Sequence, residues 1–272
     1  MINYIIMFFM GTIIGSFLNA TAMRISYIIE NFYDKNFYNK ISYFKELLLE
    51  ITLLKYMFYP LRSECPKCKN KLKWYHNIPI FSYLFLQGKC AYCKTTIPFI
   101  YLFSEIIVGF IFVLEYYYYT VFNFPLIYFI LILLALSILY IGIVIDIQTM
   151  LIPDIFIILA ILPLIYINFP LGIDNIKFFV YIFIFAYILH YIQLKLNKVF
   201  IGIQDIKLYG IAVLIFGINS IMEILFISSI IGLIFFTYRK IKYNTNVGDF
   251  GVYIYISIII YPLLKIYGIS LF

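Results

Sequence analysis

The sequence predicts an all-α integral membrane protein. Of its 272 residues, 65% are hydrophobic and 12% are charged, and the mean hydropathy is +1.01. Soluble proteins carry roughly 25% charged residues, so this composition excludes a soluble globular domain. The apolar residues form long stretches, most of them near the roughly 20 residues that a helix needs to cross a bilayer. The first 23 residues carry no charge and no clear cleavage site, so we expect the first helix to be retained.

About eight transmembrane helices are expected. They are 4–23, 99–119, 125–145, 153–171, 178–194, 205–218, 221–238 and 250–269. The sixth and seventh are short, and 208–238 is also compatible with one long helix interrupted only by Glu223. One long helix would leave Arg239 and Lys240 outside, against the rule that Lys and Arg gather on the cytoplasmic side. We therefore expect two helices with a turn at 217–220.

Basic residues determine the orientation. The segment 24–98 contains twelve Lys and Arg against five acids. Beside membrane helices, such an excess marks the cytoplasmic side more often than it marks a nucleic-acid partner. With eight helices, 18 of the 20 Lys and Arg are cytoplasmic, and only Lys177 and Lys265 are elsewhere. We expect the lipid bilayer as a partner and no nucleic acid.

Three parts follow from this arrangement. Residues 1–23 form the first transmembrane helix, 24–98 a cytoplasmic loop domain, and 99–272 a seven-helix membrane core. Within the loop, apolar residues at helical spacing over 41–59 predict an amphipathic helix on the membrane surface or capping the bundle. Its apolar positions are Phe44, Leu47, Leu48, Ile51, Leu54 and Phe58.

The four cysteines form two Cys-x-x-Cys pairs, Cys65 with Cys68 and Cys90 with Cys93, separated by 21 residues. Two such pairs supply four thiolates for a tetrahedral Zn²⁺ site, which stabilises a loop too small to have its own core. The reducing cytoplasm argues against disulfides. Because no cysteine is left over, structural zinc is favoured over catalytic zinc with an open position, and His76 is the weaker alternative ligand.

Two aspartates at helix ends are the candidate catalytic groups. Asp146 follows an uncharged run over 116–145, and an acid at such a depth is a functional candidate by default. The helix count places Asp146 and Asp205 at one membrane face. Two close carboxylates share a proton, so that one acts as base and the other as acid, which activates water for attack on a peptide bond. The structural alternative is an N-cap or a solvated acid, a role that suits Asp154 after Pro153.

Other catalytic systems are absent from the sequence. It contains no HExxH, GxSxG or Walker A motif, and its only histidines are His76 and His190. His190 is expected to be a hydrogen-bonded interior residue. Gly11 and Gly15 form a small-xxx-small pattern that predicts close helix packing in the first helix.

Together these residues resemble the type IV prepilin leader peptidases, membrane aspartyl proteases of the Gly-x-Gly-Asp type that also methylate the new N-terminus. The similarity runs nearly end to end. It is carried by Gly11-x-x-x-Gly15-Ser16-Phe17-Leu18-Asn19 with Arg24, by Arg62-Ser63-x-Cys65-Pro66-x-Cys68, by Leu72-x-Trp74-x-x-Asn77-Ile78-Pro79-Ile80-x-Ser82-Tyr83, by Gly88-x-Cys90-x-x-Cys93, by Asp146 with Ile152-Pro153-Asp154, and by Phe250-Gly251.

The second catalytic motif departs from the family pattern. The family has Gly-x-Gly-Asp with Lys two residues later, whereas this chain has Gly202, then Gln204 in place of the second glycine, then Asp205 and Lys207. Glycine allows close backbone approach or a positive φ, and Gln adds bulk and a polar side chain. We expect Asp205 to keep its role. The supporting motif residues are Gly202, Gln204, Lys207, Pro153 and Asp154.

The resemblance implies a catalytic dyad of Asp146 and Asp205 within a protease core over 99–272. The implied substrates are prepilins or pseudopilins, cleaved after a glycine at the cytoplasmic face of the bacterial inner membrane. The implied methyl donor is S-adenosylmethionine, and the complete zinc loop implies the methylating form. The sequence itself contains no glycine-rich nucleotide loop. Glu105 matches a family acid, which either positions the substrate amine or pairs with a lysine.

Two functions of other classes remain open at this point. In a proton- or ion-coupled transporter, Asp146 and Asp205 would form a relay, but transporters usually show inverted repeats and helices broken at the midplane. Here the acids lie at one face, and no repeat is evident. In a non-catalytic assembly factor with a zinc-stabilised loop, Gln204 in place of the motif glycine would accompany the loss of protease activity. Protease activity of the purified protein would favour the peptidase over the transporter and over the non-catalytic assembly factor.

Overall fold

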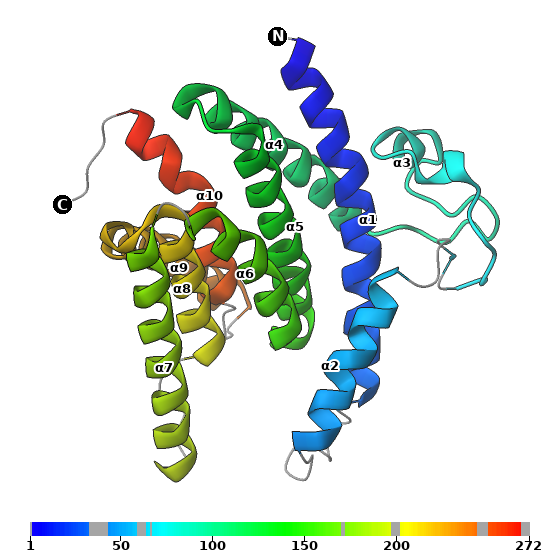
Figure 1. Cartoon of the computed structure of the whole chain (residues 1–272). Coiled ribbons are helices and arrows are strands. Elements are labelled where there is room, and N and C mark those ends of the chain that lie inside the picture. Colours follow the sequence, from blue (N-terminus) through cyan, green and yellow to red (C-terminus); the bar gives the residue numbers. More distant parts are fainter. Residues whose placement is uncertain are drawn as a thin grey trace. The chain divides into compact units, whose positions relative to one another are not determined.

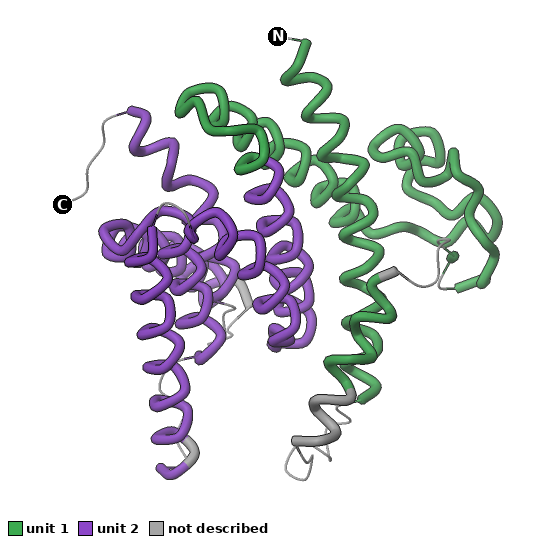
Figure 2. The backbone as a smooth tube through the Cα atoms, viewed as in Figure 1, with its two compact units in different colours: residues 1–129 green, residues 130–272 purple. Residues whose placement is uncertain are grey.

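A computed structural model describes residues 2–32, 43–58, 64–65, 67–169, 172–196, 202–243 and 250–267 of the chain. It divides into two compact units, residues 1–129 and 130–272, drawn in different colours in Figure 2. The three-part division expected from the sequence stays a prediction. Each unit is described in turn.

Two long helices form the frame of the first unit. They are α1 (Ile2–Phe32) and α4 (Phe99–Phe122), which lie side by side (Figure 1). Asn3 of α1 donates to the Tyr116 hydroxyl at 3.0 Å, and Asn19 donates to Ser104 Oγ at 2.7 Å. The earlier residue of α1 thus contacts the later residue of α4, and the later residue of α1 contacts the earlier one, so the two helices are antiparallel.

Small residues allow the close approach of α1 and α4. A Cβ added at Gly11 would lie 2.9 Å from Gly109 Cα, and one added at Gly15 would lie 2.9 Å from Val108 Cβ. Such distances leave no room for a side chain, so the glycines form the contact surface, as in other membrane helix pairs. The close packing predicted from the spacing of Gly11 and Gly15 is confirmed.

The loop between α1 and α4 contains α2 (Tyr43–Phe58), the 3₁₀ turn η2 (Trp74–Asn77) and α3 (Phe81–Phe85). The expected amphipathic helix is present as α2, which packs against α1. Among the α2 side chains that the structure describes, Leu49 and Leu53 are buried, whereas Ile51 is 55% exposed. Neither buried residue is among the six apolar positions identified from the spacing, because the contact with α1 determines which side of α2 is buried. The expected location on the membrane surface or capping the bundle stays a prediction.

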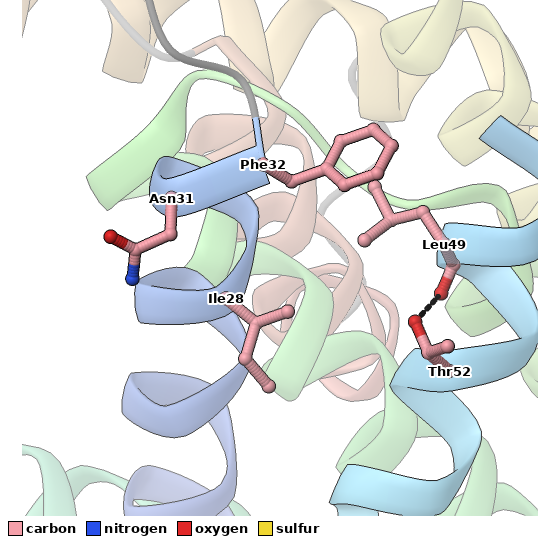
Figure 3. A pocket seen from close by; sticks show the side chains of 5 residues that line it. All are labelled: Ile28, Asn31, Phe32, Leu49 and Thr52. Carbon is pink, nitrogen blue, oxygen red and sulfur yellow. Dashed lines mark hydrogen bonds between the residues drawn. The ribbon is translucent and has the colours of Figure 1, made fainter. Parts of the chain in front are cut away.

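A groove of about 350 Å³ lies where the end of α1 meets α2 (Figure 3). It is lined by Ile28, Asn31, Phe32, Leu49 and Thr52. The Thr52 hydroxyl donates to the Leu49 carbonyl at 2.7 Å, as expected within a helix. None of these five side chains is titratable, so the groove offers no acid–base chemistry.

The second unit surrounds a short central helix, α8 (Ile203–Phe216). This helix contacts the neighbouring helices of the unit (Figure 1). These neighbours are α6 (Asp154–Asn168), α7 (Ile173–Leu196), α9 (Ile221–Tyr243) and α10 (Phe250–Ile266). A further helix, α5 (Leu126–Thr149), begins at the unit boundary, and its Leu136 carbonyl accepts a 2.9 Å hydrogen bond from the Tyr255 hydroxyl. Helix α8 is therefore held from several sides.

The chain reverses between α8 and α9 at Gly217, which has φ +86° and precedes the 3₁₀ turn η3 (Ile218–Ser220). Such a φ favours glycine because other residues carry a Cβ that clashes there. Buried Asn168 of α6 donates to the Leu214 carbonyl at 2.6 Å and so satisfies a backbone group in the last turn of α8. The turn predicted at 217–220 is confirmed.

The described residues are mostly helical, and the only strand-like pairing among them is two isolated bridges, one at Glu64 and Lys71 and one at Lys89 and Thr96. Five helices are long and apolar enough to cross a membrane: Ile2–Phe32, Phe99–Phe122, Leu126–Thr149, Ile173–Gln193 and Ile218–Ile241. The predicted class, an all-α multi-pass membrane protein, is confirmed. The helices α6, α8 and α10 have 15, 14 and 17 residues. At about 1.5 Å per residue they are shorter than the roughly 30 Å bilayer core, so a count of eight spans stays a prediction.

Candidate active site and metal centre

The two predicted catalytic acids belong to different helices of the second unit. Asp146 lies in the last turn of α5, and Asp205 lies in the first turn of α8. Both are half-buried. A Cβ added at Gly202, the N-cap of α8, would lie 2.6 Å from Asp205 Oδ2. The Asp205 carboxylate therefore folds back over the backbone of Gly202, and a side chain at this first motif position would force the carboxylate to move.

The beginning of α10 brings the two acidic stretches together. A Cβ added at Gly251 would lie 3.0 Å from Asp146 Oδ2, 3.3 Å from Leu208 Cδ1 and 3.4 Å from Ile152 Cδ1. Leu208 is three residues after Asp205, about one helical turn further along α8. Gly251 thus contacts the first acid and the helix that carries the second. From the sequence it was known only as part of the last helix.

Asp154 does not act as the N-cap of α6. The cap residue is Pro153, which makes no side-chain capping hydrogen bond, and Asp154 is the first helical residue. Its Oδ1 instead accepts hydrogen bonds from Gln204 Nε2 at 3.2 Å and from Lys207 Nζ at 2.7 Å. The sequence offered an N-cap or a solvated acid as the structural role of Asp154. The N-cap is wrong, whereas the side chain is 42% exposed, in agreement with a partly solvated acid. The residue links the first motif to the second.

Lys207 is the charged partner in this link. The residue is 4% exposed, and its Nζ also lies 5.5 Å from the centre of the Tyr187 ring of α7. A buried ammonium is costly unless it is paired, and here a carboxylate and an aromatic face both compensate it. Gln204 and Lys207 are three residues apart and therefore lie on one side of α8. Their joint contact with Asp154 fixes the rotation of the helix segment that contains Asp205.

The four cysteines of the first unit converge as predicted. The Sγ atoms of Cys65, Cys68, Cys90 and Cys93 all lie within 4.8 Å of one another. The Cys65–Cys93 Sγ distance is 3.7 Å. Four sulfurs at the usual Zn–S distance of about 2.3 Å would be separated by roughly 3.8 Å in a tetrahedron. The donor set therefore fits a tetrahedral metal ion, and His76 is not part of the cluster.

The two Cys-x-x-Cys turns have the same backbone construction. The amide of Lys69 donates to the Cys65 carbonyl at 2.8 Å, and that of Lys94 donates to the Cys90 carbonyl at 3.1 Å. Both lysines have φ +57°. Hydrogen bonds from the side chain and backbone of Thr95 lower the pKa of the Cys93 thiol to about 6. Near neutral pH this thiol is therefore a thiolate, the form that binds metal.

A polar cluster connects the same loop to the helices of the first unit. Glu105 of α4 accepts a 3.0 Å hydrogen bond from the Ile80 amide and a further one from Ser16 of α1. Ile80 has φ +63°, a conformation that is strained for a β-branched residue. Another acid of α4, Glu115, is 8% exposed and was overlooked in the sequence. The signal that could have identified Glu115 is an ionisable residue within an apolar stretch.

Two family models match successive parts of the chain. The bacterial peptidase A24 N-terminal domain matches residues 9–119, and the type IV leader peptidase family matches residues 131–237. A prepilin leader peptidase/N-methyltransferase of Vibrio cholerae is 32% identical over 220 residues, which cover 76% of this chain and 83% of that protein. The chain belongs to the type IV leader peptidase family.

Other leader peptidases match shorter parts. The prepilin leader peptidase/N-methyltransferase of Neisseria gonorrhoeae is 34% identical over 106 residues, 38% of this chain and 35% of that protein. That of Myxococcus xanthus is 41% identical over 51 residues, 19% of this chain and 15% of that protein. No solved structure matches the chain.

Membership of the leader peptidase family makes the chain a membrane-embedded enzyme. The N-terminal domain match contains the four cysteines and Glu105. The leader peptidase match contains Asp146 and Asp205. The acids and the cysteines therefore belong to two separate family modules, which agrees with the two compact units of the structure.

Proposed function

We propose that this protein is an aspartyl endopeptidase that removes the leader peptide of type IV prepilins or pseudopilins and methylates the new N-terminus. Asp146 and Asp205 form its catalytic dyad. The observation that carries the proposal is the link through Asp154, whose carboxylate accepts hydrogen bonds from Gln204 and Lys207 on either side of Asp205. A leader peptidase needs the two aspartate motifs in one fixed arrangement. The hydrogen bonds of Asp154 to Gln204 and Lys207 support such an arrangement.

The chemistry follows from two carboxylates in one site. Close carboxylates cannot both ionise easily, so they share a proton. The ionised member takes a proton from water, the water oxygen attacks the peptide carbonyl, and the protonated member donates to the carbonyl oxygen. The carboxyl that took the water proton passes it to the amide nitrogen, and collapse of the tetrahedral intermediate breaks the C–N bond, releases the new amine and returns the hydroxyl proton to the dyad. Asp146 and Asp205 supply both groups, and the scheme requires no other nucleophile.

The membrane geometry suits such a substrate. The basic segment 24–98 favours a cytoplasmic location. With eight membrane-crossing helices, the ends of the helices that carry Asp146 and Asp205 both lie at the cytoplasmic face of the bacterial inner membrane. A prepilin has a short basic leader in the cytoplasm and an apolar helix in the bilayer. Its scissile bond lies at the same depth as the proposed dyad.

The metal and the methyl donor have separate roles in this proposal. Cys65, Cys68, Cys90 and Cys93 hold Zn²⁺, which stabilises the loop between α1 and α4 and takes no part in proteolysis. S-adenosylmethionine supplies an electrophilic methyl group to the new amine. Methylation is supported by the names of the relatives, and Glu105 is the acid of the first unit best suited to hold an ammonium group.

Co-expression with a prepilin tests the proposal. The pilin N-terminus is measured by mass spectrometry for the wild type, Asp146→Asn and Asp205→Asn. The matched control is Asp174→Asn, which neutralises an exposed aspartate of α7 that pairs with the nearby surface residue Lys177. We expect leader removal and one added methyl group in the wild type and the control, and an intact leader in both dyad variants.

The outcomes separate the two activities. Cleavage that survives either dyad substitution contradicts the catalytic assignment. Cleavage by the wild type without methylation supports the dyad and removes the second activity. A wild type that leaves the leader intact favours a transporter or a non-catalytic assembly factor.

A further inference from the structure

Gln204 has one polar atom that the described part of the chain does not satisfy. Its Nε2 donates to Asp154 Oδ1 at 3.2 Å. Its Oε1 is buried and has no hydrogen-bond partner among the described residues. Buried acceptors are nearly always paired in native proteins, so an unpaired one requires an explanation. Here it lies in the residue immediately before Asp205.

The direction of this amide is determined by its neighbours. The Asp154 carboxylate already accepts a hydrogen bond from Lys207 Nζ at 2.7 Å, so its Oδ1 is an acceptor. A rotated amide would place Gln204 Oε1 against that carboxylate, and two acceptors would repel each other. The NH₂ group must therefore face Asp154. The carbonyl oxygen must point away from Asp154, where the described residues offer it no donor.

We propose that Gln204 Oε1 accepts a hydrogen bond from a backbone N–H of the peptide substrate beside the scissile bond. This inference rests on the proposed function, because it requires a peptide bound at Asp205. Gln204 is then a substrate-binding residue, and its Nε2 contact with Asp154 holds the acceptor in place. The substrate class is an extended polypeptide segment.

The substrate needs such an acceptor for a physical reason. A peptide bond inside a helix is shielded, so the cleavage segment must be extended when it meets the dyad. Its N–H groups then lose their helical partners. Beside the buried Gln204 Oε1, an N–H left without a partner is costly. An acceptor one residue from Asp205 would compensate one of these groups where the chemistry occurs.

The second glycine of the family motif cannot make this contact, because glycine has no side chain. The chain is therefore expected to bind the backbone of its substrate more tightly than its Gln204→Gly variant does. Lys207 Nζ also binds Asp154 Oδ1, so removal of the Gln204 amide leaves Asp154 with a partner. This makes a substitution of Gln204 a fair test of substrate binding.

The test combines Gln204→Met with substrate peptides in which one backbone N–H is replaced by an ester oxygen. The peptides contain a prepilin leader and the start of its apolar helix, and each N–H next to the scissile bond is replaced in turn. Full-length wild type and Gln204→Met are assayed in the same detergent for KM and kcat. Gln204→Gly, which restores the family residue, is the second variant if Gln204→Met does not fold.

We expect one ester to raise the KM of the wild type about two- to tenfold, which is the usual net value of one hydrogen bond. The same ester should leave the KM of Gln204→Met nearly unchanged relative to its own unmodified peptide. Equal effects of every ester on both proteins would overturn the inference and assign the acceptor to water. If the wild type does not cleave even the unmodified peptide, the proposed function fails and this inference fails with it.

Discussion

Lys207 Nζ lies 2.7 Å from Asp154 Oδ1 and joins the two aspartate-bearing motifs of the second unit, although the residues are 53 positions apart in the chain. The lysine side chain is 5% exposed and the aspartate side chain 42%. The pair is therefore a half-buried ion pair whose cation has little access to water. Its geometry determines how the first turn of α8, with Asp205, faces the first turn of α6.

Lys207→Met should reduce leader cleavage strongly. The substitution keeps the length of the side chain but leaves the Asp154 carboxylate without its ammonium partner. Breaking a buried pair costs about 3–5 kcal/mol, and the partial exposure of Asp154 reduces this to roughly 1–3 kcal/mol. The cleavage rate of a prepilin in detergent and the thermal unfolding midpoint measure the two effects.

Lys265→Met is the control for that substitution. Lys265 pairs with Glu223 at the same distance, 2.7 Å, at the opposite end of the helices that flank α8. It should lower the unfolding midpoint by a similar amount and leave the cleavage rate per folded molecule unchanged. Equal losses of cleavage in both variants would show that Lys207 acts only through stability.

Gly251→Ala should impair catalysis while the protein still folds. The new methyl group would lie 3.0 Å from Asp146 Oδ2, so the carboxylate must move by a few tenths of an ångström. Small misplacements of catalytic groups are costly, and we expect kcat to fall about tenfold. Gly210→Ala is the control, since its Cβ would meet only ring and methyl carbons, at 3.3 Å and beyond. A normal kcat in Gly251→Ala would contradict the placement of Asp146.

The purified protein should contain about one zinc ion per chain, measured by elemental analysis. Cys65→Ser and Cys90→Ser each remove a buried member of the four-thiolate cluster and should lose the metal. His76→Ala should retain it, because His76 lies outside the cluster. Protease digestion of the loop between α1 and α4 should become faster after metal loss. Metal that persists in both serine variants would show a different ligand set.

Metal retention should depend on pH with a definite sign. Hydrogen bonds from Thr95 hold the pKa of the Cys93 thiol near 6, below its unfolded value. The stabilisation this provides is present above the unfolded pKa and is lost as the pH falls through the folded one. We expect metal content to decline as the pH is lowered, because protons compete with the metal for the four thiolates. Thr95→Val should move this decline to higher pH, whereas Thr96→Val should not.

Gly11→Leu should destabilise the first unit. At this position a Cβ would lie 2.8 Å from Phe112 Cβ and 2.9 Å from Gly109 Cα, so α1 and α4 must separate. Overpacking of this kind costs about 1–3 kcal/mol, visible as a lower unfolding midpoint in detergent. Ile13→Leu is the control, because Ile13 is 60% exposed on α1. An unchanged midpoint in Gly11→Leu would contradict the tight contact of α1 with α4.

Features set by local chemistry were predicted from the sequence. The helices follow from long apolar stretches, and the break between α8 and α9 follows from Gly217, whose φ of +86° other residues resist. The metal cluster follows from two identical Cys-x-x-Cys turns. The helices and the turn depend on neighbours within a few residues, and the two cysteine pairs are marked by their spacing, which the sequence shows directly.

Contacts between distant segments were decided only by the tertiary structure. Asp154 was considered as an N-cap or a solvated acid, and its carboxylate binds Gln204 and Lys207, 50 and 53 residues later in the chain. The buried side chains Leu49 and Leu53 of α2 are not among the apolar positions identified from the spacing, whereas Ile51, which is one of them, is 55% exposed. In both cases the outcome depends on how a helix is rotated against its neighbour, and helical periodicity leaves that rotation open. The sequence by itself determined the helices, the turn and the four cysteines that cluster. Packing between helices determined which polar side chains meet around the two aspartates.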